Sequence, residues 1–109
     1  MRFSVVVPLY NKENCIRMTL ESVKKQSFKD YEVIVVDDGS TDCSLEEARK
    51  IKSENITIIH QQNQGVSVAR NTGILHAQGQ YIAFLDADDE WEPDYLKTID
   101  HLIEKYPES

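Results

Sequence analysis

The chain has 109 residues, of which 40% are hydrophobic and 28% charged, a composition ordinary for one soluble domain or part of one. Its 19 Asp and Glu outnumber its 12 Lys and Arg, giving a formal charge of -7. This balance argues against a nucleic-acid backbone as the partner, because such binders need a basic face.

Four apolar runs predict four buried strands. The first, Phe3 to Pro8, is β-branched and nearly continuous, as in a strand covered on both faces. The second begins at Tyr31 and ends in two aspartates, and the last ends in an acidic segment. We expect strands at residues 3–8, 31–38, 56–60 and 81–86.

Segments with helical spacing follow each strand. In the third of them Gly73 lies inside the pattern and Gly79 is expected to stop the helix. Pro93 suits the first turn of the last helix. We expect helices at residues 13–26, 40–53, 65–79 and 93–105.

This alternation predicts an α/β fold, with a Rossmann-like parallel sheet and helices on both faces, as one unit over residues 1–109. Right-handed crossovers favour the strand order 3-2-1-4. Ligands of such sheets bind beyond the carboxyl ends of the strands, where the chain reverses direction. Three polar segments are expected there, at residues 8–11, 37–40 and 86–89.

Asp86 and Asp88 are candidate metal ligands. In an extended chain, residues two apart project from the same side, so both carboxylates can face one ion. Hard oxygen ligands suit Mg²⁺ or Mn²⁺ and leave positions for water and substrate phosphates. A solvated acidic loop, or a cap for the following helix, remains an alternative.

The other two segments offer polar groups for a ligand. Asp37 and Asp38 point to opposite faces, so at most one of them meets a ligand, and the alternative is a turn followed by a helix cap. Tyr10 could stack on a base and Asn11 could bond to it, unless they form an ordinary loop. Arg70 could meet a phosphate, unless it forms a surface ion pair.

Several other functions lack their motifs. No Gly-x-Gly-x-x-Gly follows the first strand, and no Gly-x-x-x-x-Gly-Lys-Ser/Thr occurs. The serines have no histidine-based arrangement for nucleophilic catalysis. Cys15 and Cys43 have no metal-ligand spacing and are expected to be reduced thiols. No run approaches the roughly 18 apolar residues of a membrane span. We therefore expect a cytoplasmic chain.

Taken together, "SVVVPLYNKE", "YEVIVVDDGSTD", "NQGVSVARNTGI" and "GQYIAFLDADDEWEPDYL" resemble the family 2 glycosyltransferases with a GT-A fold. The resemblance covers nearly the whole chain. It implies an inverting enzyme of polysaccharide or glycoconjugate synthesis, which transfers a sugar from a nucleoside diphosphate, usually UDP, to an acceptor hydroxyl. The acceptor would be a glycan or a lipid-linked molecule.

The resemblance also implies roles for particular residues. Asp88 would be the principal ligand of a divalent Mn²⁺ or Mg²⁺, and Asp86 would support the metal or hold the ribose. Asp38 would accept a hydrogen bond from the base, and Arg70 would lie near the donor. The other residues implied at the nucleotide-sugar site are Pro8, Tyr10, Glu13 and Ala87.

Family members continue well past the D-x-D segment, and their later part carries the base that deprotonates the acceptor. This sequence stops at Ser109, about half a catalytic domain, and none of its residues can be nominated as that base. We therefore expect a donor-binding half that is inactive alone, in the cytoplasm or peripheral at the inner face of the membrane. The fourth strand would leave an open apolar edge, which favours a homodimer.

Two alternatives remain open at this point. One is a nucleotide-sugar binding module without catalysis. The other is a phosphoacceptor receiver domain, although that class places its acidic pair after the first strand and needs a fifth strand.

Overall fold

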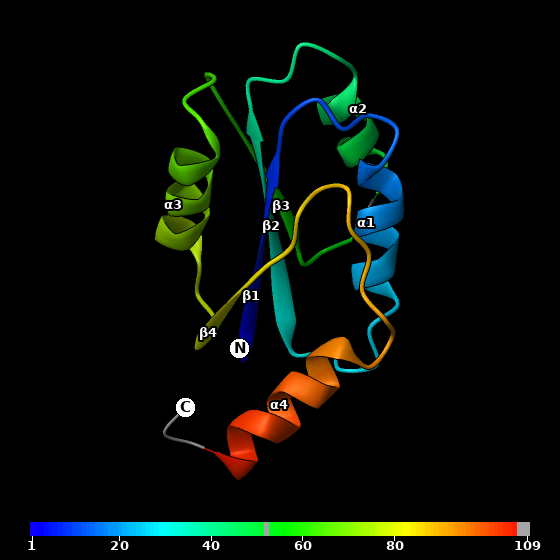
Figure 1. The fold of residues 1–109 in the computed structure, drawn as a ribbon, viewed down its shortest axis with the longest axis vertical. Coiled ribbons are helices and arrows are strands. Elements are labelled where there is room, and N and C mark those ends of the chain that lie inside the picture. The colour runs from blue at the N-terminus through cyan, green and yellow to red at the C-terminus, as the bar shows by residue number, and fades with distance from the viewer. Residues whose placement is uncertain (52, 107–109) are drawn as a thin grey trace.

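A computed structural model describes residues 1–51 and 53–106 of the chain. Strands and helices alternate along it, as the sequence predicts (Figure 1). Lys52, within the predicted second helix, and residues 107–109 at the end of the predicted unit lie outside the described residues. The elements are β1 (Phe3–Leu9), α1 (Ile16–Lys24), β2 (Tyr31–Asp38), α2 (Ser44–Arg49), β3 (Ile56–Gln61), α3 (Val66–His76), β4 (Tyr81–Phe84) and α4 (Tyr95–Lys105).

The strands form one parallel sheet in the order β3-β2-β1-β4, which confirms the predicted topology. β1 lies between its two neighbours in register, with Phe3 opposite both Tyr31 and Tyr81. All seven residues of β1 are buried, which accounts for its nearly continuous apolar sequence. Because the strands are parallel, the carboxyl ends of β1, β2 and β4 lie next to one another at the same end of the sheet.

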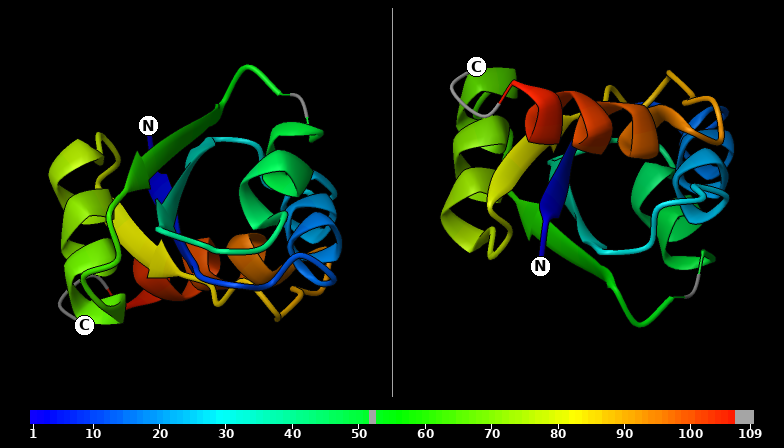
Figure 2. Two further views of the ribbon diagram at one scale, coloured as in Figure 1. Left: turned by 90° about the horizontal axis from the view of Figure 1, so that it is seen from above. Right: turned by 90° about the horizontal axis from the view of Figure 1, so that it is seen from below.

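Helices cover both faces of the sheet, with α1 and α2 on one side and α3 on the other (Figure 2). The larger core joins one face of β1 and β2 to apolar residues of α1, α2 and α4. The smaller core joins Ile34 and Val36 of β2 to Ala69 of α3. α4 lies at the end of the sheet opposite to the predicted crevice. Its residues Asp100 and Glu104 form ion pairs with Arg2, which precedes β1.

The structure explains two glycines by close packing. α3 ends at His76, so the prediction that Gly79 stops this helix is wrong. The φ angle of Gly79 lies outside the left-handed region, and a Cβ there would lie 2.6 Å from the backbone carbon of Phe3. Gly79 therefore allows the chain to pass close to β1. Gly73 has a similar role inside α3, because an added Cβ would lie 2.3 Å from Cγ1 of Val6.

Most element boundaries differ from the prediction, and two of the differences concern Pro93 and the acidic segment. α4 begins at Tyr95, so Pro93 lies in the turn before the helix rather than in its first turn. There the carbonyl of Pro93 accepts a hydrogen bond from the Ser27 amide at 2.8 Å. β4 ends at Phe84, two residues short of Asp86, and the chain then enters a turn.

β4 forms an edge of the sheet in the described chain, where it pairs with β1 alone. Tyr81 and Ile82 are each 36% exposed and Phe84 is 46% exposed. The edge is therefore apolar, as expected. Across the described residues, none of the helices is long and apolar enough to cross a membrane.

Candidate functional site

A cavity of about 460 Å³ opens where β1, β2 and β4 end, at the crevice predicted from the strand order. Its walls come from the three segments expected there and from the segment that leads from β3 into α3. The lining residues are Pro8, Leu9, Tyr10, Lys12, Asp38, Asn63, Gly65, Val66, Ala69, Asp86, Ala87 and Asp88. Six of the eight predicted site residues belong to this set, and Glu13 and Arg70 do not.

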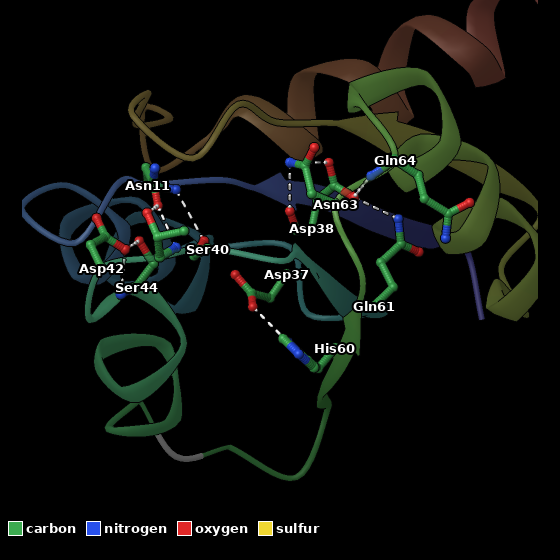
Figure 3. Close-up of polar contacts among 11 residues, drawn as sticks. Asn11, Asp37, Asp38, Ser40, Asp42, Ser44, His60, Gln61, Asn63 and Gln64 are labelled. Carbon is green, nitrogen blue, oxygen red and sulfur yellow. Dashed lines mark hydrogen bonds and ion pairs between the residues drawn. The ribbon is translucent and has the colours of Figure 1, made fainter.

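Asp38 joins the end of β2 to the start of α3 (Figure 3). The carboxylate is nearly inaccessible, with the residue 3% exposed. Its Oδ1 accepts hydrogen bonds from the Gln61 side chain and the Gln64 amide, each at 2.9 Å. Its Oδ2 accepts from the Gly65 amide at 2.9 Å and from Nδ2 of Asn63 at 3.4 Å. Four donors thus occupy about four acceptor positions of this carboxylate.

These hydrogen bonds set the charge state of Asp38. Burial acts to raise the pKa of this carboxyl, but the bonds donated by Gln61, Gln64 and Gly65 outweigh it and leave the pKa below its ordinary value. The cavity wall therefore carries a carboxylate that stays ionised at neutral pH.

Asp37 points to the opposite face of β2 and lines no part of the cavity (Figure 3). Its Oδ2 is hydrogen-bonded to Nδ1 of His60 at 2.8 Å. Its Oδ1 is buried without a hydrogen-bond partner among the described residues. The prediction that at most one of the two acids faces the crevice is confirmed.

The acidic segment after β4 forms a turn, in which the Asp89 amide donates to the Asp86 carbonyl at 3.0 Å. The extended-chain reasoning for Asp86 and Asp88 is therefore wrong, although the turn brings their carboxylates together. One carboxylate oxygen from each of Asp86, Asp88 and Asp89 lies within 4.8 Å of the others. Asp89 is a third candidate metal ligand, which the argument from an extended chain missed.

Two cations compensate these acids. Nζ of Lys12 lies 3.5 Å from Oδ2 of Asp88, and Nη2 of Arg70 lies 3.8 Å from Oδ1 of Asp86. Arg70 also lies over the ring of Phe84, so it pairs at the rim of the cavity without lining it. Sequence reasoning missed Lys12, whose only signal was its place just after Tyr10 and Asn11. These pairs are exposed and therefore weak.

Tyr10 and Glu13, in the same loop after β1, point to different surroundings. The Tyr10 side chain lines the cavity and is 45% exposed, so a planar ligand could stack on it. Glu13 is turned toward the start of α2, where its Oε2 accepts a hydrogen bond from the Cys43 amide at 2.9 Å. Glu13 therefore borders the loop and not the cavity.

The sequence of this chain is similar to those of known proteins. Residues 4–109 match the sequence model of the family described as Glycosyl transferase family 2. Glycosyltransferase GlyA of Streptococcus pneumoniae is 42% identical over 107 residues, which are 96% of this chain and 15% of that protein. The putative teichuronic acid biosynthesis glycosyltransferase TuaG of Bacillus subtilis is 41% identical over 106 residues, 94% of this chain and 42% of that protein.

Solved structures share the fold. TarS 1–349 of S. aureus, in complex with UDP, superimposes with a TM-score of 0.91 and 35% identity, covering 98% of this chain and 33% of that one. The mannosyltransferase PcManGT of Pyrobaculum calidifontis, in complex with GDP-Man and Mn²⁺, gives a TM-score of 0.88 at 29% identity, covering 94% of this chain and 32% of that one. The chain thus spans between 15% and 42% of the length of these four proteins.

Proposed function

Because this chain belongs to glycosyl transferase family 2, we propose that its cavity binds a nucleoside diphosphate sugar, the donor in a sugar transfer. The observation that carries the proposal is that three kinds of chemical group line one cavity. An exposed ring at Tyr10, a buried ionised carboxylate at Asp38 and an acidic turn at 86–89 lie around the same cavity. They match the base, the polar edge of the base and the metal-bound diphosphate of such a donor.

The nucleoside end of the donor would lie between the β1 and β2 ends. Pro8 and Tyr10 would border the base, and Asp38 would accept a hydrogen bond from it. Since four protein donors already bond to Asp38, a base must exchange with one of them. The hydrogen bond from the side-chain Nδ2 of Asn63, at 3.4 Å the longest of the four, is the one we expect the base to replace.

The acidic turn fits a divalent cation, because it offers three carboxylate oxygens, the hard ligands that Mg²⁺ and Mn²⁺ prefer. We assign Asp88 as the principal ligand and Asp86 as support for the metal or the ribose, with Ala87 fixing the turn between them. Ala87 is 4% exposed, and its carbonyl accepts from the Thr19 hydroxyl at 2.9 Å. When bound, the ion would stabilise the charge of the departing diphosphate.

The cations beside the turn have a place in this arrangement. A metal held by Asp86 and Asp88 would compete with Lys12 and Arg70 for these carboxylates, which would leave both cations available to phosphate oxygens. Glu13 would act from outside the cavity by supporting the loop that carries Tyr10 and Lys12. Each of the predicted site residues thus has a role, though two of them act from beyond the lining.

We propose UDP as the nucleotide, inversion as the stereochemical course, and a glycan or lipid-linked hydroxyl as the acceptor. The UDP complex of TarS supports the first choice, while the GDP-Man complex of PcManGT shows that relatives differ in donor. The name of TuaG supports synthesis of a cell-surface polysaccharide. The receiver-domain alternative is excluded by the family match.

The donor site can be tested by calorimetric titration of the chain with UDP, with and without Mn²⁺. We expect metal-dependent binding that weakens at least tenfold in Asp88→Ala, because a charged ligand to the ion is removed. Asp30→Ala is the matched control, since Asp30 is exposed and precedes β2 at the far end of the sheet. No binding by a folded wild-type chain, or equal binding by Asp88→Ala, would contradict the proposal.

The same purified chain should transfer little or no sugar to an acceptor, because the acids around the cavity, Asp38 and those of the acidic turn, are assigned here to the donor and the metal. Binding without transfer fits both a donor-binding part and a non-catalytic module. Measurable sugar transfer would contradict this expectation and assign the base to the residues present.

We further propose that two chains pair through the β4 edge, and that the protein works in the cytoplasm or at the inner membrane face. The support for pairing is the exposed row of Tyr81, Ile82 and Phe84 beside unpaired backbone groups. Light scattering at rising concentration should show a dimer that Ile82→Lys weakens. A strictly monomeric wild-type chain would rule this pairing out.

A further inference from the structure

We propose that Asn11 is a positioning residue, which fastens the loop after β1 to the loop after β2 and so presets Tyr10 and Lys12 at the cavity. This inference rests on the donor-binding function proposed above. It concerns a residue whose own side chain lines no part of the cavity.

Asn11 bonds to the second loop in both directions (Figure 3). Its backbone amide donates to Oγ of Ser40 at 3.0 Å. Its side-chain Oδ1 accepts from the Thr41 amide at 2.8 Å and from the Thr41 hydroxyl at 3.3 Å. The amide side chain therefore completes a reciprocal contact between residues about 30 positions apart, as a backbone pairing would.

Further bonds extend this contact along both loops. The Lys12 amide donates to Oγ of Ser44 at 2.7 Å, and Ser44 in turn donates to Oδ1 of Asp42 at 2.5 Å. The Glu13 amide donates to Oδ2 of Asp42 at 3.2 Å. Burial acts to raise the pKa of Asp42, but the bonds from Ser44 and Glu13 outweigh it and hold that pKa below its ordinary value. The hydrogen bonds between the two loops thus end at the ionised carboxylate of Asp42.

The backbone of Asn11 explains why the loop needs a fastening. Its φ angle is 49°, in the left-handed region that few residues other than glycine enter, with asparagine among the tolerated ones. The reversal turns the Asn11 side chain toward the second loop, whereas Tyr10 before it and Lys12 after it line the cavity. The left-handed conformation of Asn11 thus leaves the side chains of Tyr10 and Lys12 facing the cavity.

The expected benefit of this arrangement is affinity. Tyr10 is 45% exposed and the Lys12 side chain is 44% exposed, and a loop that is free to move would have to be ordered when the donor binds. Ordering a loop on binding reduces the affinity, whereas a preset loop avoids that cost. The contact between the loops therefore acts on binding through residues that do touch the ligand.

The test compares Asn11→Gly with Asn11→Asp. Glycine keeps the left-handed backbone but removes the acceptor for Thr41, whereas aspartate keeps an acceptor and tolerates the same backbone. Amide hydrogen exchange, measured without nucleotide, should speed up at Lys12 and Thr41 in Asn11→Gly and stay near wild type in Asn11→Asp. The Kd for UDP with Mn²⁺ should rise about three- to tenfold in Asn11→Gly, the loss of roughly one hydrogen bond.

Ser40→Ala gives an independent check, because it removes the other half of the same contact. Its effect on the Kd should be similar to that of Asn11→Gly, and the double variant should be little worse than either single one. Unchanged exchange at Lys12 and Thr41 in Asn11→Gly would overturn the fastening.

The positioning role and the proposed function fail in different ways. Normal UDP binding by wild type together with an unchanged Kd in Asn11→Gly would overturn the positioning role alone. A folded wild-type chain that does not bind UDP would overturn the proposed function, and with it any role for Asn11 in that binding.

Discussion

Asp38→Ala should lower the free energy of unfolding by about 1.5–3 kcal/mol, which is the range for hydrogen bonds to a charged group. The substitution removes the acceptor of bonds from Gln61, Asn63, Gln64 and Gly65, which together fix the path from β3 into α3. Because this path is also a wall of the cavity, UDP binding should be lost as well. Urea unfolding and calorimetry on the same preparation would measure both effects.

Asp38→Asn is the informative control, since it keeps the shape but turns one acceptor into a donor that faces other donors. We expect most of the destabilisation to persist in this variant. Asp37→Asn should leave UDP binding intact, because Asp37 faces away from the cavity. If Asp38→Asn had the stability and the UDP affinity of wild type, the hydrogen bonds that this carboxylate accepts would not be what fixes the segment from β3 to α3.

The pH dependence of unfolding offers a second check on Asp38. Its folded-state pKa lies below the ordinary value of 3.8, which applies to the unfolded chain. The stability that it contributes is therefore fully present well above pH 3.8 and is lost as the pH falls through the folded pKa. The loss of stability in acid should be shallower in Asp38→Ala than in wild type.

Gly73→Ala should destabilise the chain by about 1–3 kcal/mol, the usual cost of overpacking a filled core. In an exposed helix the same change would stabilise by up to about 1 kcal/mol, because glycine is a poor helix former. Here the added Cβ would lie 2.3 Å from Cγ1 of Val6, a fully buried β-branched side chain of β1, so the helix or this side chain must shift. Thermal unfolding should show a fall in Tm of several degrees.

The direct test of this contact is a double variant. Val6→Ala alone should destabilise by leaving a cavity, yet Gly73→Ala with Val6→Ala should be more stable than the sum of the two single effects predicts. Simple additivity would mean that α3 shifts to accept the methyl group, and that Gly73 is not what sets its distance from the sheet.

The fold was predictable because its signals are local and consistent. β1 and β2 read as continuous apolar runs, the crossovers have one hand, and these constraints suffice for the order β3-β2-β1-β4. Gly79 was misread because a helix-ending glycine and a glycine in close backbone contact look alike in sequence. Only the position of β1 beside it distinguishes the two.

At the site, sequence reasoning placed the acids better than it placed their partners. Strand alternation predicts only that at most one of Asp37 and Asp38 faces the crevice, and the family resemblance points to Asp38, which is the one that lines the cavity. The four donors to Asp38, the ion pair of Lys12 with Asp88 and the inclusion of Asp89 depend on loop conformations. Loop conformations come from tertiary contacts, which neither periodicity nor spacing encodes.

The parallel pairing of β1 with β4 has a consequence for the order in which the cavity is assembled during synthesis. Phe3 can pair with Tyr31 soon after β2 emerges, but its pairing with Tyr81 waits for three crossovers to be made. The Tyr10 and Asp38 walls can therefore form while the acidic turn is still untranslated. A growing chain can therefore form the part of the cavity lined by Tyr10 and Asp38 before it forms the part lined by Asp86 and Asp88.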